Sequence, residues 1–329
     1  MSKIGKIVAD RAIPFLEGVL EPYFDVDYLS GDAISRDDLK DAVALLVRTR
    51  TECNSHLLSG TPVRLVATAT IGTDHIDSLW CSLSGIRTVS APGCNSGGVC
   101  QYVFAALSAL DIRPLSSDGR IRTLGVIGVG HVGSKVAAKG RELGFNVLEN
   151  DPPRSLGLPL DELLSSSDIV TLHIPLEGNR DFAGYGFFEK IRSGACFINA
   201  SRGEVVVDEA LLQARNTLGR IVLDVWRNEP ELDRRMLDAA DIATPHIAGY
   251  SIQGKANGTT AVVRAVGETF GIPELAKYTV PLTLPAHPQA YDILADDRAL
   301  RTDPASFEAL RNHYAYRDET VFHTKSPVK

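Results

Sequence analysis

The sequence is poor in cysteine, has no long apolar run and carries no recognisable targeting segment. Its five cysteines are scattered, and no two of them form a C-x-x-C pair. This odd, dispersed set argues against a disulfide scaffold and against a zinc site. No apolar run reaches the roughly 18 residues of a membrane span, and the few apolar residues before Asp10 do not make a signal peptide. We therefore expect a cytoplasmic protein with no bound metal and no membrane partner.

The chain also lacks an excess of positive charge. Lysine and arginine number 34 against 41 aspartates and glutamates, which gives a net charge of −7 at pH 7. This balance argues against nucleic acid as a partner, while a local basic pocket for a small anion stays compatible with it. Hydrophobic residues make up 44% and charged residues 23%, as in ordinary globular proteins. A length of 329 residues suits two or three domains.

Short β runs alternate with helical segments along most of the chain. The expected β runs are residues 6–9, 42–47, 65–69, 123–127, 146–149, 169–173, 196–199, 221–225 and 242–244. A buried apolar helix is expected at residues 96–110, a further helix from about Gly254, and a last one at residues 306–313. This alternation predicts an α/β fold of doubly wound parallel sheets, in which ligands gather at the carboxyl ends of the strands.

A glycine-rich turn joins the predicted strand 123–127 to a predicted helix at residues 134–143. Residues 128–133 read Gly-Val-Gly-His-Val-Gly, and Asp151 ends the next predicted strand. In this context Gly128 allows the tight turn, Gly130 lets a pyrophosphate approach, and Gly133 allows close helix packing. Asp151 can accept hydrogen bonds from ribose hydroxyls and disfavours a 2′-phosphate. The segment therefore predicts an NAD site; a turn that binds nothing is the alternative.

Three polar residues follow three successive predicted strands. They are Arg202 in Asn-Ala-Ser-Arg-Gly, Glu229 before Pro230, and His246 after Pro245. Oxidation of a secondary alcohol needs a base near neutral pKa, a partner that orients it, and a cation for a substrate carboxylate, and these residue types suit the three roles. Each residue taken alone could equally have a structural role, as a helix cap or as part of a turn. Together, after a nucleotide fingerprint, they predict a dehydrogenase site.

The order of these motifs resembles the D-2-hydroxyacid dehydrogenase superfamily over about residues 1–280. Four further segments resemble its 4-phosphoerythronate dehydrogenase family: residues 68–75 (TATIGTDH), 91–95 (APGCN), 151–154 (DPPR) and 244–255 (TPHIAGYSIQGK). The resemblance implies oxidation of 4-phospho-D-erythronate to (R)-3-hydroxy-2-oxo-4-phosphooxybutanoate with NAD, a step of pyridoxine 5′-phosphate (vitamin B6) biosynthesis. A different substrate, such as 3-phosphoglycerate, glyoxylate or hydroxypyruvate, and a non-catalytic NAD-sensing protein remain as alternatives.

The resemblance also assigns roles to residues. It implies that Arg202 and Glu229 are catalytic, that His246 accepts the proton, and that the substrate contacts Thr49, Thr70 and Tyr250. The implied NAD contacts are Gly128, Gly130, His131, Val132, Gly133, Asp151, Ile174, Asp224 and Gly249. From the residues themselves, Arg48 and Arg50 beside Thr49 can gather a phosphate, although a solvated surface charge is the simpler role for Arg50.

The resemblance implies a discontinuous arrangement of domains. An NAD-binding Rossmann domain at residues 96–249 is inserted in a flavodoxin-like substrate domain at residues 1–95 and 250–279. Residues 280–329 resemble a shortened C-terminal dimerisation segment, and we expect a homodimer acting on a small phosphorylated 2-hydroxy acid.

Overall fold

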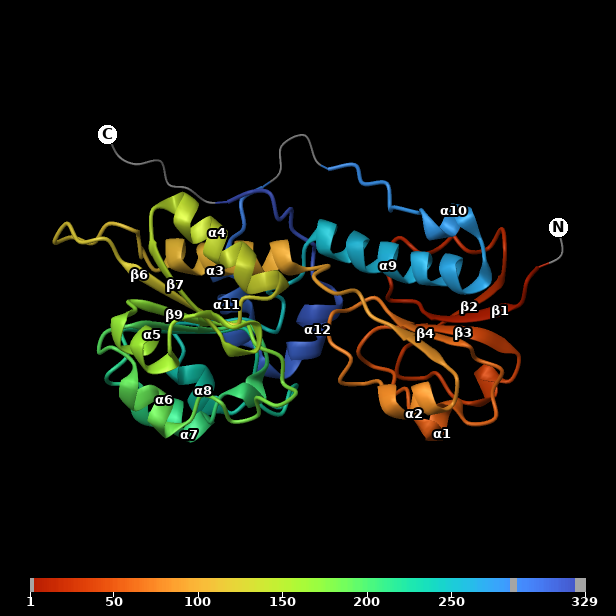
Figure 1. Cartoon of the computed structure of the whole chain (residues 1–329), viewed down its shortest axis with the longest axis horizontal. Helices are drawn as coiled ribbons and strands as arrows, with labels where there is room; N and C mark the ends of the chain where they lie inside the picture. Colours follow the sequence, from red (N-terminus) through yellow and green to blue (C-terminus); the bar gives the residue numbers. More distant parts are fainter. Residues whose placement is uncertain (1–2, 285–288, 323–329) are drawn as a thin grey trace. The chain divides into compact units, whose positions relative to one another are not determined.

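The computed structural model describes residues 3–284 and 289–322, which form two compact units. The first unit comprises Met1–Asn95 and Ile252–Pro285, and the second comprises Ser96–Ser251 and Ala286–Lys329. Each unit is built around its own parallel sheet with helices on both faces (Figure 1). The α/β fold class predicted from the sequence is confirmed.

The first unit has a five-stranded parallel sheet in the order β2-β1-β3-β4-β5. Its strands are β1 (Lys6–Asp10), β2 (Asp25–Leu29), β3 (Ala42–Val47), β4 (Leu65–Thr68) and β5 (Arg87–Val89), and its helices are α1 (Ser55–Leu58), α2 (Ser78–Leu83), α9 (Ile252–Phe270) and α10 (Pro273–Ala276). Helices α9 and α10 lie over one face and α1 and α2 over the other (Figure 1).

Alternation along the strands of the first unit separates two apolar cores. Leu46 of β3 packs in the core that contains Val263 of α9, while its neighbour Leu45 packs in the core that contains Leu57 of α1. Successive side chains of a strand point to opposite faces, so both faces of this sheet are apolar and both are covered.

The second unit has a seven-stranded sheet in the order β12-β11-β10-β9-β6-β7-β8, with only the edge strand β8 antiparallel. Its strands are β6 (Thr123–Ile127), β7 (Asn146–Asp151), β8 (Leu156–Gly157), β9 (Ile169–Leu172), β10 (Cys196–Asn199), β11 (Arg220–Leu223) and β12 (Ile242–Ala243). Its helices are α3 (Ser96–Ala109), α4 (His131–Leu143), α5 (Leu160–Ser166), α6 (Tyr185–Lys190), α7 (Asp208–Ala214), α8 (Arg234–Ala239), α11 (Ile293–Thr302) and α12 (Phe307–Asn312).

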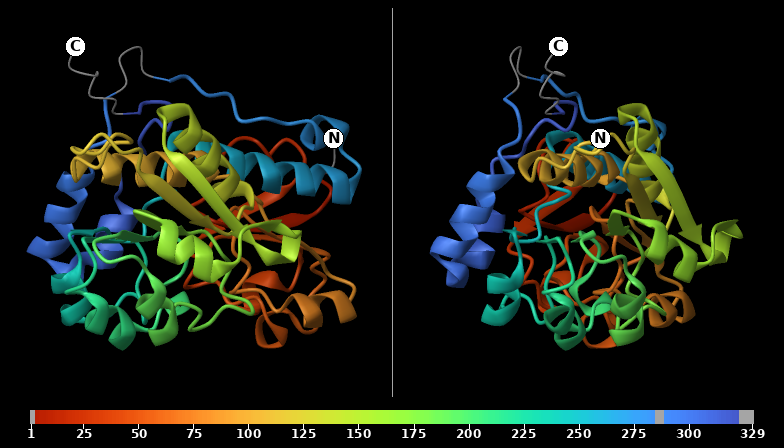
Figure 2. Two further views of the ribbon diagram at one scale, coloured as in Figure 1. Left: turned by 60° about the vertical axis from the view of Figure 1, so that its left-hand side comes forward. Right: turned by 90° about the vertical axis from the view of Figure 1, so that its left-hand side faces the viewer.

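The last two helices of the second unit lie beside its sheet edge. The amide of Ala243 in β12 donates to Asp297 Oδ1 of α11 at 2.8 Å, and Phe307 of α12 is fully buried in the core beneath the sheet. Figure 2 shows both helices (blue) at this edge. The Ala243 amide, which an open edge strand would expose, is thereby satisfied. Residues 285–288 and 323–329 of the predicted dimerisation segment lie outside the described residues.

Some elements differ from the sequence prediction. Strand β2 was not predicted, because Asp25 and Asp27 interrupt its apolar residues and an edge strand needs no continuous buried run. The short strands β5 and β8 were missed for the same reason, since both lie at sheet edges. Helix α4 begins at His131, three residues before the predicted start. Among the described helices, none combines the length and the hydropathy needed to cross a membrane.

Candidate active site

The turn after β6 has the shape of a dinucleotide cradle. Gly128 has φ of +82°, a region that favours glycine, and a Cβ there would lie 2.5 Å from the carbonyl oxygen of His173. At Gly133 a Cβ would lie 1.9 Å from the Gly128 carbonyl oxygen, so helix α4 can pack this close only with glycine. At Gly130 a Cβ would meet nothing within 4 Å. The space that a pyrophosphate needs is therefore open at Gly130.

Helix α4 and strand β7 complete the cradle. His131 and Val132 form the first turn of α4, whose free N–H groups favour an anion. Asp151 ends β7, and its Oδ2 accepts the Val129 amide at 2.7 Å. As a hydrogen-bond acceptor at the end of this strand, its carboxylate can accept a ribose hydroxyl. Arg154 Nε lies 3.7 Å from Asp151 Oδ2. The residues present therefore fit NAD.

Residues after β9 line the same turn. Ile174 Cγ2 lies 2.7 Å from the position that a Cβ on Gly128 would take. His173 Nε2 is 3.0 Å from Thr171 Oγ1, whereas its Nδ1 is buried and has no partner in the described part of the chain. Burial lowers the pKa of His173 to about 3, so its ring is neutral. His173 was not predicted as a site residue, because a histidine after an apolar strand has no distinctive signature.

The structure brings Glu229 and His246 into direct contact. Strands β10, β11 and β12 are parallel neighbours, so Arg202, Glu229 and His246 all follow strand ends at one edge of the sheet. His246 Nδ1 lies 2.8 Å from Glu229 Oε2, and Glu229 Oε1 accepts the Trp226 amide at 2.9 Å. Arg202 is half-buried, and its Nη1 donates to the Ser201 carbonyl at 2.8 Å. A carboxylate on Nδ1 directs the other imidazole nitrogen, Nε2, away from the pair.

Electrostatics keep Glu229 ionised beside His246. Burial acts to raise the pKa of Glu229, but the His246 charge, its hydrogen bond and the Trp226 amide outweigh burial and lower that pKa. The carboxylate therefore carries its negative charge at neutral pH. It can stabilise a positive charge on the imidazole when the ring takes a proton.

The loop that carries His246 is held by Asp224. His246 has φ of +55°, an uncommon value for a non-glycine residue that costs on the order of 1–3 kcal/mol. The Asp224 carboxylate, only 1% exposed, accepts the Ile247 amide at 2.8 Å, the Ala248 amide at 2.9 Å and the Thr244 hydroxyl at 2.7 Å. Burial raises the pKa of Asp224 against these opposing interactions. Its side chain thus supports the loop, and its predicted NAD contact stays a prediction.

Gly249 and Tyr250 continue the same loop. The Tyr250 ring packs edge-on against two tyrosines of the C-terminal segment, with centroids 5.9 Å from Tyr314 and 6.3 Å from Tyr316. Arg311 of α12 is half-buried, and the neighbouring Tyr250 side chain acts to raise its pKa. These C-terminal residues were not predicted as part of the site, because the helix expected at residues 306–313 carries no local sign of where it packs.

Thr49 and Thr70 lie in the first unit. They follow β3 and β4, which are parallel neighbours, so both lie at the carboxyl edge of that sheet. Thr49 is exposed, while the Thr70 hydroxyl lies 2.7 Å from that of Thr68 and donates to the Gly72 carbonyl at 3.2 Å. Arg48 Nη1 donates to the Ala12 carbonyl at 3.1 Å.

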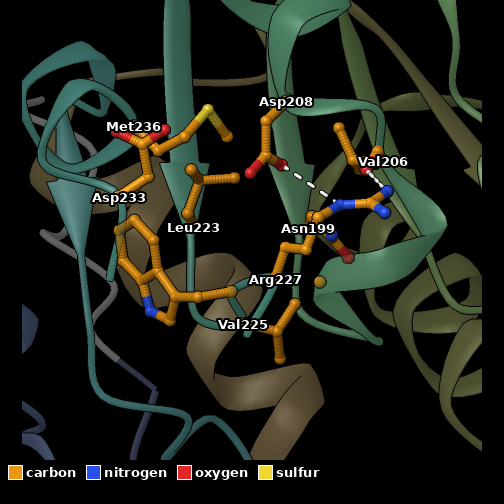
Figure 3. A pocket seen from close by; sticks show the side chains of 10 residues that line it. Asn199, Val206, Asp208, Leu223, Val225, Arg227, Asp233 and Met236 are labelled. Carbon is orange, nitrogen blue, oxygen red and sulfur yellow. Dashed lines mark hydrogen bonds and ion pairs between the residues drawn. The ribbon is translucent and has the colours of Figure 1, made fainter. Parts of the chain in front are cut away.

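A small cavity is lined by residues that include Asn199, Asp208, Leu223 and Arg227 (Figure 3). Its volume is about 10 Å³, which is room for about one water molecule. Arg227 on its wall donates to the Val206 carbonyl at 2.5 Å and lies 3.9 Å from Asp208. The cavity is too small for a substrate. Within residues 3–284 and 289–322, no group of three or more His, Cys, Asp and Glu side chains is placed to hold a metal.

The chain is similar in sequence to known dehydrogenases. The family model described as the NAD-binding domain of D-isomer specific 2-hydroxyacid dehydrogenases matches residues 111–248. Erythronate-4-phosphate dehydrogenase of Porphyromonas gingivalis is 38% identical, with 95% of this chain and 93% of that protein covered. The protein of the same name from Salmonella newport is 39% identical, with 95% and 92% covered.

Solved structures show the same fold at lower identity. The NAD⁺-bound 3-phosphoglycerate dehydrogenase of Entamoeba histolytica is 22% identical with a TM-score of 0.70, covering 86% of this chain and 100% of that one. D-Lactate dehydrogenase of Aquifex aeolicus, complexed with NAD and lactic acid, is 23% identical with a TM-score of 0.65, covering 84% and 100%.

Proposed function

Because this chain belongs to the erythronate-4-phosphate dehydrogenase family of the D-isomer specific 2-hydroxyacid dehydrogenases, we propose that it oxidises 4-phospho-D-erythronate at C2. The product is (R)-3-hydroxy-2-oxo-4-phosphooxybutanoate, and the step belongs to pyridoxine 5′-phosphate biosynthesis. The enzyme is an NAD-dependent dehydrogenase. The observation that carries the proposal is the 2.8 Å contact between His246 and Glu229 at the strand edge that Arg202 shares.

Each member of the proposed triad has a distinct task. His246 Nε2 takes the proton of the substrate C2 hydroxyl, while Nδ1–H donates to Glu229 and fixes the ring. Glu229 stabilises the imidazolium that forms. Arg202 offers a planar fork that matches the substrate carboxylate. When bound, NAD accepts the hydride from C2.

We assign the substrate contacts to Thr49, Thr70 and Tyr250. The proposed NAD contacts of the second unit are Gly128, Gly130, His131, Val132, Gly133, Asp151, Ile174, Asp224 and Gly249. The open space at Gly130 and the position of Asp151 support this assignment. We also propose a cytoplasmic homodimer in which residues 280–329 contribute to the subunit contact.

NADH formation by the purified protein tests the proposal. The panel contains 4-phospho-D-erythronate, 3-phosphoglycerate, D-lactate and D-glycerate, with a 2-oxo acid added to re-oxidise tightly held cofactor. We expect the highest kcat/KM with 4-phospho-D-erythronate. A higher kcat/KM with 3-phosphoglycerate would support the other superfamily activity. Binding of NAD without turnover of any 2-hydroxy acid would support a sensing protein.

His246→Ala tests the assignment of His246 as the base. We expect turnover to disappear while NAD binding, followed by the quenching of protein fluorescence, stays close to that of the wild type. Turnover that is unchanged in this variant contradicts the role of His246. Light scattering of the wild-type protein tests the homodimer independently, and a monomer at assay concentration contradicts that part.

A further inference from the structure

Arg317 lies in the extended stretch after α12 and is buried, with only 8% of its surface exposed. All three guanidinium nitrogens donate. Nε donates to Gln101 Oε1 at 2.8 Å, Nη1 to the Ile247 carbonyl at 2.9 Å, and Nη2 to the Gly98 carbonyl at 3.1 Å and to the Ala248 carbonyl. The guanidinium also lies 4.2 Å from the ring centroid of Tyr291.

Two of these acceptors belong to the loop that carries the catalytic histidine. Ile247 and Ala248 directly follow His246, and their amides donate to the buried Asp224 carboxylate. Their carbonyls accept from Arg317. The backbone of these two residues is therefore held through its N–H groups by a carboxylate and through its C=O groups by a guanidinium. We call Asp224 and Arg317 together the loop clamp.

The backbone on both sides of the clamp needs support. His246 has φ of +55°, so its ring direction depends on how the following peptide groups are fixed. On the other side, the Arg317 amide donates to the Tyr250 carbonyl at 3.4 Å, and Ser251 and Arg317 form an isolated parallel bridge. The C-terminal stretch thus runs alongside the whole loop from Ile247 to Ser251.

We propose that Arg317 is a positioning residue for the dehydrogenase reaction, acting through the backbone of residues 247 and 248 on His246 and Tyr250. This inference rests on the proposed function. On this proposal the C-terminal stretch positions residues of the chain's own active site, in addition to any role in a subunit contact.

The position of Arg317 requires a planar guanidinium, whose three nitrogens donate to separate acceptors. A lysine keeps the positive charge but has a single ammonium group, which cannot reach acceptors on Gln101, Gly98 and the loop together. The loop carbonyls then lose a fixed donor, and the catalytic ring loses its defined direction. A misplacement on the order of 1 Å in a catalytic group can lower turnover by about 100-fold.

The test compares Arg317→Lys with Arg301→Lys. Arg301 is a matched control because it also comes from the C-terminal segment and also bonds backbone carbonyls, those of Leu237 at 2.9 Å and Ala240 at 2.8 Å. Those carbonyls end helix α8 and do not belong to the catalytic loop. Both variants replace a guanidinium with an ammonium group, but only Arg317→Lys does so at the loop that carries His246.

We expect Arg317→Lys to lower kcat with 4-phospho-D-erythronate by at least about tenfold while the Kd for NAD changes by less than about threefold. Arg301→Lys should keep kcat within about twofold of the wild type. Equal kcat in the wild type and Arg317→Lys overturns the proposal, and so does an equal loss in both variants.

A substrate-free measurement separates this inference from the proposed function. The imidazole resonances of His246, assigned by their loss in His246→Asn, should shift or broaden in Arg317→Lys and stay unchanged in Arg301→Lys. Unchanged resonances in Arg317→Lys overturn the clamp, even if the wild type turns over no substrate. A wild type that forms no NADH, with shifted resonances in the variant, contradicts the function alone.

A second variant covers the case in which Arg317→Lys does not fold. Gln101 is buried, and its amide nitrogen donates to the carbonyls of Asp318 and Val321 at 2.7 Å each, so it fastens the stretch that carries Arg317. Gln101→Met has a similar shape and removes the amide that bonds Asp318, Val321 and Arg317. We expect a smaller fall in kcat and the same movement of the His246 resonances. If neither changes in a folded Gln101→Met protein, the proposal is wrong.

Discussion

Glu229→Gln isolates the charge of the residue that orients the catalytic histidine. The glutamate makes two contacts, with His246 Nδ1 at 2.8 Å from Oε2 and with the Trp226 amide at 2.9 Å from Oε1. A glutamine keeps the size of the side chain but has one acceptor oxygen, because its nitrogen only donates. It can therefore satisfy one of the two donors and carries no charge to balance an imidazolium.

The size of the effect follows from these contacts. A hydrogen bond to a charged group is worth about 1.5–3 kcal/mol. If that interaction is made in full only when His246 holds the substrate proton, its loss lowers kcat by about 10- to 100-fold. KM should change less, because Glu229 is assigned no contact with the substrate. Steady-state kinetics at saturating NAD measure both constants.

Acid titration gives the same variant a second, independent signature. The folded pKa of Glu229 lies below its ordinary value of 4.5. The carboxylate therefore stabilises the fold above that value, and this contribution is lost as the pH falls through the folded pKa. Urea unfolding should show Glu229→Gln less stable than the wild type near neutral pH, with a difference that shrinks below pH 4.5. A kcat equal to that of the wild type, or a stability difference independent of pH, refutes the reasoning.

Three further predictions concern the cofactor turn. Gly133→Ala forces a Cβ to within 1.9 Å of a backbone oxygen, so thermal unfolding should show a free energy of unfolding lower by about 1–3 kcal/mol. As its control, Gly130→Ala places a Cβ that meets no atom within 4 Å. This variant should unfold like the wild type but bind NAD more weakly. Asp151→Asn removes the charged ribose acceptor, and titration calorimetry should show NAD affinity reduced by about tenfold and the preference over NADP diminished. His173 has a folded pKa of about 3, whereas its unfolded pKa is near 6.5. As the pH falls between these values, the unfolded state binds the proton first, and the free energy of unfolding falls by up to about 1.4 kcal/mol per pH unit. Unfolding of His173→Gln at several pH values should lack this contribution.

The sequence predicted the central strands and the edge strand β12, but not the edge strands β2, β5 and β8. Strands β3, β6 and β10 occupy the predicted ranges, because their continuous apolar runs are buried on both faces. Strand β2, with charges at Asp25 and Asp27, had no such run to reveal it. Periodicity therefore finds a strand through its burial, and an exposed edge strand escapes it.

In the candidate site, the residues that follow strand ends were predictable from the nearby sequence, whereas contacts between residues far apart in the chain were not. Arg202, Glu229 and His246 each follow a strand end, so sequence order alone predicted a shared edge, and the structure places their strands side by side. The support from Asp224 and Arg317 was not predicted. Arg317 bonds the Gly98 carbonyl across 219 positions of the chain, and no local pattern reports so distant a contact.

Single-turnover transfer of deuterium tests directly whether hydride moves from C2 of 4-phospho-D-erythronate to NAD and whether His246 is needed for that step. The purified protein, loaded with NAD, is mixed with 4-phospho-D-erythronate deuterated at C2, and the cofactor is analysed by mass spectrometry. We expect NADH that carries the deuterium in the wild type and none with His246→Ala. Unlabelled NADH, or no reduced cofactor from this substrate while C2-deuterated 3-phosphoglycerate yields labelled NADH, would contradict this expectation.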